Sequence, residues 1–457
     1  MNRIGLGMIA LAALAAAPAI SLAADDASAT QPTVAQLQEQ LRQLQAKVEQ
    51  LQGQQAQLNS KVVDETVQQV LRDSEKRSQF LQLEGMTAGW NNDQFFLSSA
   101  DGNWSFIPHL MLQFRNVTSY NQADDDDLEN GFEIRRLKLI FDGTAVSKDL
   151  FYHFQWNTSS VGSVALDDAY LRYTIPDTNG IQVKAGQYKD PWIKEENVGD
   201  HRQLAAERSM LNALLGGGGP ALRVQGVSLI HEGKQYRAEF MYHDGATSLN
   251  TNFQDGGGPA TFLGGGVGDN FGISGRVDWY FSEKSKEVDD FTALGNKQDL
   301  LVVGGGFDWT QAGDNNALFH TVDVQWENAS GLGVYAAYVG VYRDLNTAAT
   351  GGFPPADTFY DYGVLVQAGY VIPDTNWEPF ARYDVTKLDE DSLPAGSEDT
   401  IHEITGGVNY YFYKHNAKLT VDATWLPNGS PSAQTGLGVL AGDDDEFILR
   451  AQVQLYL

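Results

Sequence analysis

Residues 447–457 read FILRAQVQLYL and end the chain. Phe447, Leu449 and every second residue up to Leu457 are apolar, whereas the residues between them include Arg450 and two glutamines. A period of two predicts a β-strand whose two faces meet different surroundings. Because the apolar face continues to the last residue, we expect lipid on that side and water on the other. This arrangement is typical of a strand in a transmembrane β-barrel.

The same alternation extends back to Trp104, so the fold class is predicted to be all-β. We expect a transmembrane 16-stranded antiparallel β-barrel over residues 104–457. Its strands are predicted near residues 104–120, 132–142, 149–157, 166–175, 181–188, 222–231, 235–243, 271–281, 299–309, 317–327, 332–343, 359–371, 377–387, 401–412, 417–426 and 445–457.

The connections between these strands alternate in length. Those after even-numbered strands are mostly short turns, such as residues 177–180 and 414–416, whereas those after odd-numbered strands are mostly longer. Residues 282–298 are the exception, because this connection is too long and too charged for a simple turn. Short turns at one rim and long loops at the other are the outer-membrane pattern, and they put both ends of the barrel on the periplasmic side.

A soluble β-sandwich or β-helix is the alternative to a membrane barrel. It is disfavoured because the outward faces stay apolar and aromatic in strand after strand, as in Tyr152, Phe154 and Trp156. A barrel also needs no protected edge strands, because closure removes the edges.

The composition indicates an exported protein. The chain has 457 residues, no cysteine, and 31 basic against 59 acidic side chains. Residues 1–24 are typical of a signal peptide, with Arg3 before an apolar stretch and a small-residue cleavage site. Its removal leaves a formal charge of 30 − 59 = −29, which argues against a nucleic-acid partner. No other stretch approaches the ~18 apolar residues of a spanning helix.

Residues 25–81 contain a Gln-rich segment in which valine and leucine recur with heptad spacing from Val34 to Val62. Roughly four heptads predict a coiled coil in the periplasm, which would favour oligomerisation and could contact the cell wall. A single amphipathic helix packed on its own domain is the alternative. Residues 82–103 are expected to form a linker that enters the barrel.

The polar faces of the strands are expected to line the lumen. The first eight strands then bring mostly basic residues inside and the last eight mostly acidic ones, so a basic wall would face an acidic wall. Such a field would draw small anions along one side. Alternatively, the luminal charges pair with their neighbours and only solvate the pore. The predicted basic wall consists of Arg115, Arg136, Lys138, Arg172, Lys184, Arg237 and Arg276, and the predicted acidic wall of Asp308, Asp323, Glu327, Asp361, Glu378, Asp384, Glu403 and Asp422.

The longest connection, residues 189–221, has a helix-like segment followed by four glycines at 216–219. It could fold inward and constrict the pore, or cap the barrel from outside. The acidic runs 124–127 and 443–446 are expected to be solvated parts of outer loops, with weak divalent-cation binding as the alternative. The candidates for a constriction are Lys189, Lys194, Arg202 and Arg208.

The sequence predicts no enzyme, no cofactor and no metal site. Residues 402–406 begin like a zinc-binding helix but lack the second histidine, and the glycine runs lack the ending of a phosphate-binding loop. His153 or His243 could lie near luminal acids, but their spacing to other groups defines no catalytic triad.

Four motifs resemble the phosphate-selective porin O and P family: residues 132–139 (FEIRRLKL), 167–173 (DDAYLRY), 183–192 (VKAGQYKDPW) and 223–227 (RVQGV). The resemblance covers most of the chain after Trp90. It implies a sixteen-stranded, homotrimeric porin in the outer membrane, surrounded by lipid, in which pore-facing cations draw anions inward. Carried over by motif, those cations would be Arg136, Lys138, Arg172, Lys184 and Lys189.

Three functions follow as hypotheses. The first is a porin for passive diffusion of small hydrophilic solutes, with a preference for anions such as phosphate. The second is a general, cation-preferring or sugar-preferring pore, which the acidic outer loops favour. The third is a structural protein that tethers the outer membrane to the cell wall through the coiled coil.

Overall fold

The computed structural model describes residues 39, 42–43, 45–50, 68, 85–91, 94–121, 127–158, 162–216, 223–246, 248–250, 271–282, 286–345, 357–393 and 397–457. The chain forms two units, residues 1–80 and residues 81–457. In the first unit the described residues are helical. The predicted signal peptide and the contacts of the predicted coiled coil lie outside the described residues. No helix in the described part of the chain is long and apolar enough to cross a membrane.

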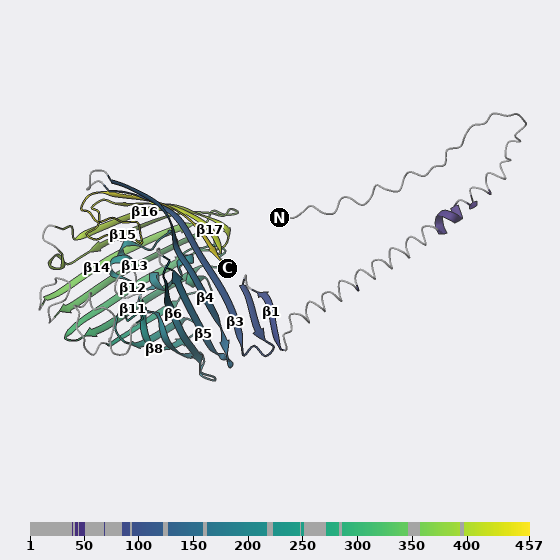
Figure 1. Ribbon diagram of the computed structural model, residues 1–457, viewed down its shortest axis with the longest axis horizontal. Helices are drawn as coiled ribbons and strands as arrows, with labels where there is room; N and C mark the ends of the chain where they lie inside the picture. The colour runs from purple at the N-terminus through teal and green to yellow at the C-terminus, as the bar shows by residue number, and fades with distance from the viewer. Residues whose placement is uncertain are drawn as a thin grey trace, which may run out of the picture. The chain divides into compact units, whose positions relative to one another are not determined.

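The second unit is a closed antiparallel barrel (Figure 1). Each strand from β3 onward pairs with the next, and β18 closes the barrel by pairing with β3 from Glu446↔Asn121 to Tyr456↔Met111. The predicted sixteen-stranded barrel is therefore confirmed. Its strands are β3 (Ser105–Asn121), β4 (Asp127–Ala145), β5 (Ser147–Thr158), β6 (Val164–Thr174), β7 (Ile181–Lys189), β8 (Arg223–Glu232), β9 (Tyr236–His243), β10 (Phe271–Tyr280), β11 (Leu300–Ala312), β12 (Asn315–Glu327), β13 (Leu332–Leu345), β14 (Asp357–Tyr370), β15 (Trp377–Lys387), β16 (Thr400–Tyr413), β17 (Ala417–Leu426) and β18 (Glu446–Tyr456).

The two faces of each strand differ in exposure, as the alternating sequence requires. In β18, Phe447 is 53% exposed and Leu449 52%, whereas Arg450 and Gln452 are 1% and 2% exposed. The apolar residues therefore form the outer surface of the barrel, and the polar residues lie inside. A barrel in lipid needs this distribution, because its backbone groups are all paired between strands and only its side chains meet the hydrocarbon.

Tight turns join the strands at the rim predicted to be periplasmic. Asp177, Asn179 and Lys414 have positive φ angles of 62°, 52° and 45° in the turns after β6 and β16. Asparagine and aspartate tolerate this region better than most residues. The opposite rim has one tight turn as well, because Ala312 pairs directly with Asn315 where the sequence predicted a longer connection.

The segment predicted as a linker contains a β-hairpin, formed by β1 (Met86–Asn91) and β2 (Gln94–Ser99). The hairpin joins the barrel because β2 pairs with the start of β3 through Leu97↔Phe106 and Ser98↔Ser105. In Figure 1 the hairpin that contains β1 lies beside β3, with β2 as the strand between them.

The long connection after β10 folds into the barrel, which the sequence did not predict. It contains the short helix η2 (Lys286–Asp289). Phe291 is 2% exposed and packs against Tyr335 of β13, with the two rings tilted by 40° and their centroids 4.5 Å apart. The Thr292 hydroxyl donates to Glu378 of β15 at 2.5 Å. This segment therefore occupies part of the lumen at the rim of the short turns.

Candidate functional site

The connection after β7 also folds into the barrel. It contains the short helices α2 (Lys194–Asn197), η1 (Asp200–Arg202) and α3 (Met210–Leu215). Trp192 is fully buried and packs on Phe319 of β12, with ring centroids 5.5 Å apart. Helix α3 contacts β13, β14 and β15. The described part of this connection, residues 190–216, is called the inner loop below.

Glu207 of the inner loop is held by three arginines of the barrel wall. Its Oε1 lies 2.6 Å from Arg115 Nη1 and 2.6 Å from Arg135 Nε, and its Oε2 lies 2.8 Å from Arg136 Nη2. Burial raises the pKa of the Glu207 carboxyl, but Arg135, Arg136 and Arg115 outweigh this effect and lower the pKa below its ordinary value. Glu207 therefore stays ionised and fixes the loop to β3 and β4.

Asp200 makes a second set of ion pairs with the same wall. Its carboxylate lies 2.6 Å from Lys138 Nζ, 2.6 Å from Arg208 Nη1 and 3.6 Å from Arg136 Nε. Burial raises its pKa, yet the attraction of Lys138, Arg208 and Arg136 lowers the pKa well below the ordinary value. Asp200 thus links the loop to the wall and also to another residue of the loop.

The opposite side of the inner loop meets the acidic wall through backbone N–H groups. Ala206 N donates to Asp422 at 2.8 Å, Met210 N to Glu403 at 2.5 Å, and Leu211 N to Asp384 at 3.1 Å. Two of these donors lie at the start of α3, where the N–H groups have no partner within the helix. Carboxylates accept strong hydrogen bonds from such donors.

The inner loop therefore joins the two walls. The carboxylates of Glu207 and Asp200 face the basic strands, and the N–H groups of Ala206, Met210 and Leu211 face the acidic strands. Carbonyl oxygens of the loop add further bonds, because Lys418 Nζ donates to Gln203 O at 2.6 Å and Arg276 Nη1 donates to Trp192 O at 3.3 Å. The charge difference between the walls positions the loop across the lumen.

Among the residues of the predicted basic wall, Arg115, Arg136, Lys138 and Arg276 contact the inner loop. Arg237 instead pairs with Glu239, at 2.5 Å. The remaining two, Arg172 and Lys184, lie together on β6 and β7.

Arg172 and Lys184 are direct cross-strand partners. The Arg172 guanidinium lies 4.6 Å from the centre of the Phe151 ring, and Lys184 Nζ lies 3.6 Å from that of Tyr188. The nearest carboxylate oxygen paired with Lys184 is that of Glu239, at 3.8 Å. Among the described residues, no carboxylate pairs with Arg172. The two cations therefore retain charge that the wall does not neutralise closely.

The four candidates for a constriction contact the two segments that fold into the barrel, namely the inner loop and residues 286–289. Lys189 Nζ and Arg208 Nε both pair with Glu196, at 3.3 and 3.1 Å. Lys194 Nζ donates to the carbonyl of Val288 at 2.9 Å. This bond joins the inner loop to the segment that enters from the other rim. Arg202 lies 3.9 Å from Asp289 and is more exposed.

Arg135 is absent from the predicted basic wall because a β-bulge in β4 changes the alternation of inward and outward side chains. Gln113 pairs with Arg136 and Phe114 pairs with Ile134, so Arg135 has no partner opposite it on β3. An extra residue in one strand re-aims its side chain, and both Arg135 and Arg136 reach Glu207. Strict alternation counted back from the exposed Leu139 would have placed Arg135 outside.

The acidic runs on outer loops have different outcomes. Residues 124–126 and the side chain of Asp127 lie outside the description of the structure. Asp443 to Asp445 are exposed as expected, whereas Glu446 is fully buried. The Glu446 carboxylate accepts hydrogen bonds from the Ser119 hydroxyl at 2.9 Å and from Leu440 N at 2.7 Å.

A closed barrel with an apolar exterior, a polar interior and a loop across its lumen defines a channel protein of porin type. Residues 111–280 match the family model described as phosphate-selective porin O and P. The predicted resemblance is thus confirmed over a segment that contains the whole predicted basic wall, from Arg115 to Arg276. Family and fold together indicate a channel of the outer membrane.

Solved structures of outer-membrane proteins share this fold at low sequence identity. OmpF of Salmonella typhi, solved with daunomycin, is 16% identical with a TM-score of 0.52, over 78% of this chain and 98% of that chain. OprB of Pseudomonas putida at high pH is 9% identical with a TM-score of 0.50, over 78% of this chain and 95% of that chain. No curated protein sequence matches the chain.

Proposed function

We propose that the protein is a passive diffusion channel for small hydrophilic solutes with a preference for anions such as phosphate. The barrel and the family support the channel, and the preference rests on the cations of β6 and β7. In this proposal the inner loop narrows the lumen, and solutes pass along the part of the basic wall that the loop leaves uncovered.

The observation that carries the anion preference is the cross-strand pair of Arg172 and Lys184. Like charges directly opposite each other on a sheet repel, and among the described residues only Glu239, at 3.8 Å from Lys184, is near enough to pair with either of them. A mobile anion between the two side chains would relieve this repulsion. Guanidinium and ammonium groups both bind phosphate oxygens well.

The reversal potential in a planar bilayer across a KCl gradient tests this proposal. For the unmodified channel we expect a reversal potential with the sign of a chloride-selective channel. In the double variant Arg172→Gln/Lys184→Gln we expect this potential to shift toward the value of a potassium-selective channel. Lys234→Gln removes an exposed lysine in the turn between β8 and β9 and should leave the potential unchanged. Cation preference in the unmodified channel would refute the proposal.

The ion pairing of the other wall cations favours a second candidate, an unselective channel or one that prefers cations or sugars. Arg115, Arg136 and Lys138 each face a carboxylate of the inner loop at 2.8 Å or less. If these pairs cancel the field of the wall, the reversal potential should be near zero or of the cation sign. The double variant should then change it little.

A further inference from the structure

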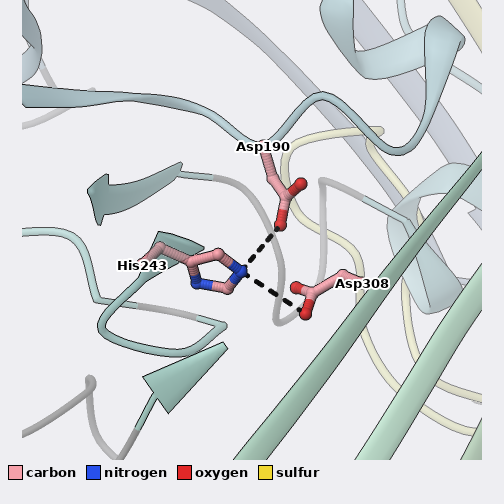
Figure 2. A group of neighbouring side chains, drawn as sticks. All are labelled: Asp190, His243 and Asp308. Carbon is pink, nitrogen blue, oxygen red and sulfur yellow. Dashed lines mark ion pairs between the residues drawn. The ribbon is translucent and has the colours of Figure 1, made fainter. Parts of the chain in front are cut away.

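Three side chains from separate parts of the barrel meet near its outer rim (Figure 2). Asp190 directly follows β7, His243 is the last residue of β9, and Asp308 lies in β11. His243 Nε2 lies 4.0 Å from Asp190 Oδ2 and 3.6 Å from Asp308 Oδ1. All three residues are buried, with exposures of 1%, 1% and 0%.

Each of these three side chains has one polar atom that the described part of the protein does not satisfy. Asp190 Oδ2, Asp308 Oδ2 and His243 Nε2 are buried and have no hydrogen-bond partner among the described residues. No lysine or arginine of the described residues forms an ion pair with either carboxylate. Two buried carboxylates without a compensating cation are costly, because burial removes their hydration.

We propose that Asp190, His243 and Asp308 bind a divalent transition-metal ion of the zinc class. One oxygen of each carboxylate and one imidazole nitrogen lie within 4.8 Å of one another. Bonds of about 2.0–2.1 Å at tetrahedral angles would separate two ligand atoms by about 3.3 Å, so the site needs only small shifts to close. The two charges of the ion would offset the two carboxylates.

The donor set selects the class of ion. Imidazole nitrogen suits zinc, cobalt and nickel, whereas calcium and magnesium prefer sites built from oxygen alone. A further oxygen is close by, because Ser274 lies opposite Asp308 on β10 and its hydroxyl is buried. This hydroxyl could complete the coordination directly or through water.

Glycine at position 272 leaves room for the imidazole ring. A Cβ added to Gly272 would lie 2.2 Å from His243 Cε1, so any larger residue would displace the ring. Gly272→Ala should therefore disturb the site without removing a ligand, which makes it a second, independent variant.

The proposal also requires a change at the other ring nitrogen. Gly245 N lies 3.1 Å from His243 Nδ1 and donates to it, so the hydrogen of a neutral ring lies on Nε2. A metal-bound Nε2 leaves the hydrogen on Nδ1, which would then face the Gly245 N–H. Metal binding must therefore break the Gly245 contact and move the hydrogen between the ring nitrogens.

Metal content is the direct test. Full-length protein in detergent micelles, purified without a polyhistidine tag and stripped with a chelator, is titrated with Zn²⁺ and with Co²⁺. We expect one ion per chain and a visible Co²⁺ spectrum of four-coordinate type. Asp190→Asn, His243→Gln and Asp308→Asn should each weaken binding by more than about 100-fold, because loss of a residue that only hydrogen-bonds to a metal ligand already costs about 10–100-fold.

His231→Gln is the matched control, because His231 bonds to Tyr236 in a different part of the barrel. It should bind zinc as the unmodified protein does. If a variant that lacks one of the three ligands does not fold, zinc binding by Gly272→Ala and the nitrogen NMR shifts of His243 in the unmodified protein test the proposed site instead. The proposal is overturned by binding that all variants retain, by the absence of binding, or by a ring that keeps its hydrogen on Nε2 after Zn²⁺ is added.

Discussion

At the scale of single residues, Glu207 has the largest role in holding the inner loop. One carboxylate accepts hydrogen bonds from Arg115, Arg135 and Arg136, and none of these arginines can lose its charge at ordinary pH. Removing one partner of a buried ion pair is more damaging than removing the whole pair, because the other charge stays buried.

Glu207→Gln should therefore loosen the inner loop. The neutral amide cannot offset three guanidinium groups, and we expect a loss of stability of about 3–5 kcal/mol together with a larger, noisier single-channel conductance. Thermal unfolding and bilayer recordings measure the two effects. Glu390→Gln is the control, since the Glu390 side chain is 81% exposed. Equal behaviour of the two variants would show that Glu207 does not fix the loop.

The pH dependence of stability follows from the same carboxylate. Its pKa is lowered from 4.5 in the folded protein. A lowered pKa means that the stabilisation is complete above pH 4.5 and is lost progressively as the pH falls below this value. The difference in unfolding temperature between the unmodified protein and Glu207→Gln should thus be constant from pH 7 to 5 and shrink toward pH 3. A constant difference over the whole range would exclude charge as the cause.

At the scale of elements, the strands could be predicted from the sequence because each has two unlike faces. A shift by one residue would put a face such as Phe447, Leu449 and Val453 into the lumen, so alternation fixes the register. The turn residues Asp177 and Lys414 mark where strands end. Predicted and observed bounds therefore agree within a few residues for β15, β17 and β18.

The sequence predicts inward folding of residues 189–221 only as one of two alternatives, and it does not predict the contacts inside the lumen. The segment around Phe291 and the inner loop lack periodic patterns, and their positions depend on residues far away in the sequence. The bulge at Arg135 does leave a trace in the sequence, because the apolar residues of this strand fall at positions 132 and 134 but then at 137 and 139. His243 and Asp308 approach each other because β9, β10 and β11 are neighbours in the sheet, and Asp190 reaches them from the start of the inner loop.

A substitution at Gly306 of β11 tests whether the contact between this strand and the inner loop affects conductance. A Cβ at this position would lie 2.1 Å from the Trp192 carbonyl oxygen, so Gly306→Ala should push the start of the inner loop off the wall. We expect an altered conductance with the barrel intact. At Gly406 an added Cβ meets nothing within 4 Å, and Gly406→Ala should conduct normally. An unchanged conductance in both variants would mean that the loop does not limit flow.

At the scale of the whole molecule, the barrel and the predicted coiled coil can be tested separately. We propose that residues 34–62 serve attachment to the cell wall or assembly into a homotrimer. Their deletion should leave single-channel conductance unchanged, because every strand of the barrel lies after residue 80. Envelope attachment and the mass of the detergent complex are the readouts. Loss of conductance in the deletion variant would instead make the segment part of the channel.

The bonds of the inner loop also constrain the order of events during assembly. Ala206 binds Asp422, which lies 216 residues later, and His201 binds Gln454, which lies 253 residues later. Contacts so distant in sequence form only after a large entropic cost of chain closure has been met. The loop can bind Arg115 and Arg136 early, but its partners on β17 and β18 are in place only after these last strands have joined the sheet. The lumen thus acquires its final shape at the end of biogenesis, when β18 joins β3.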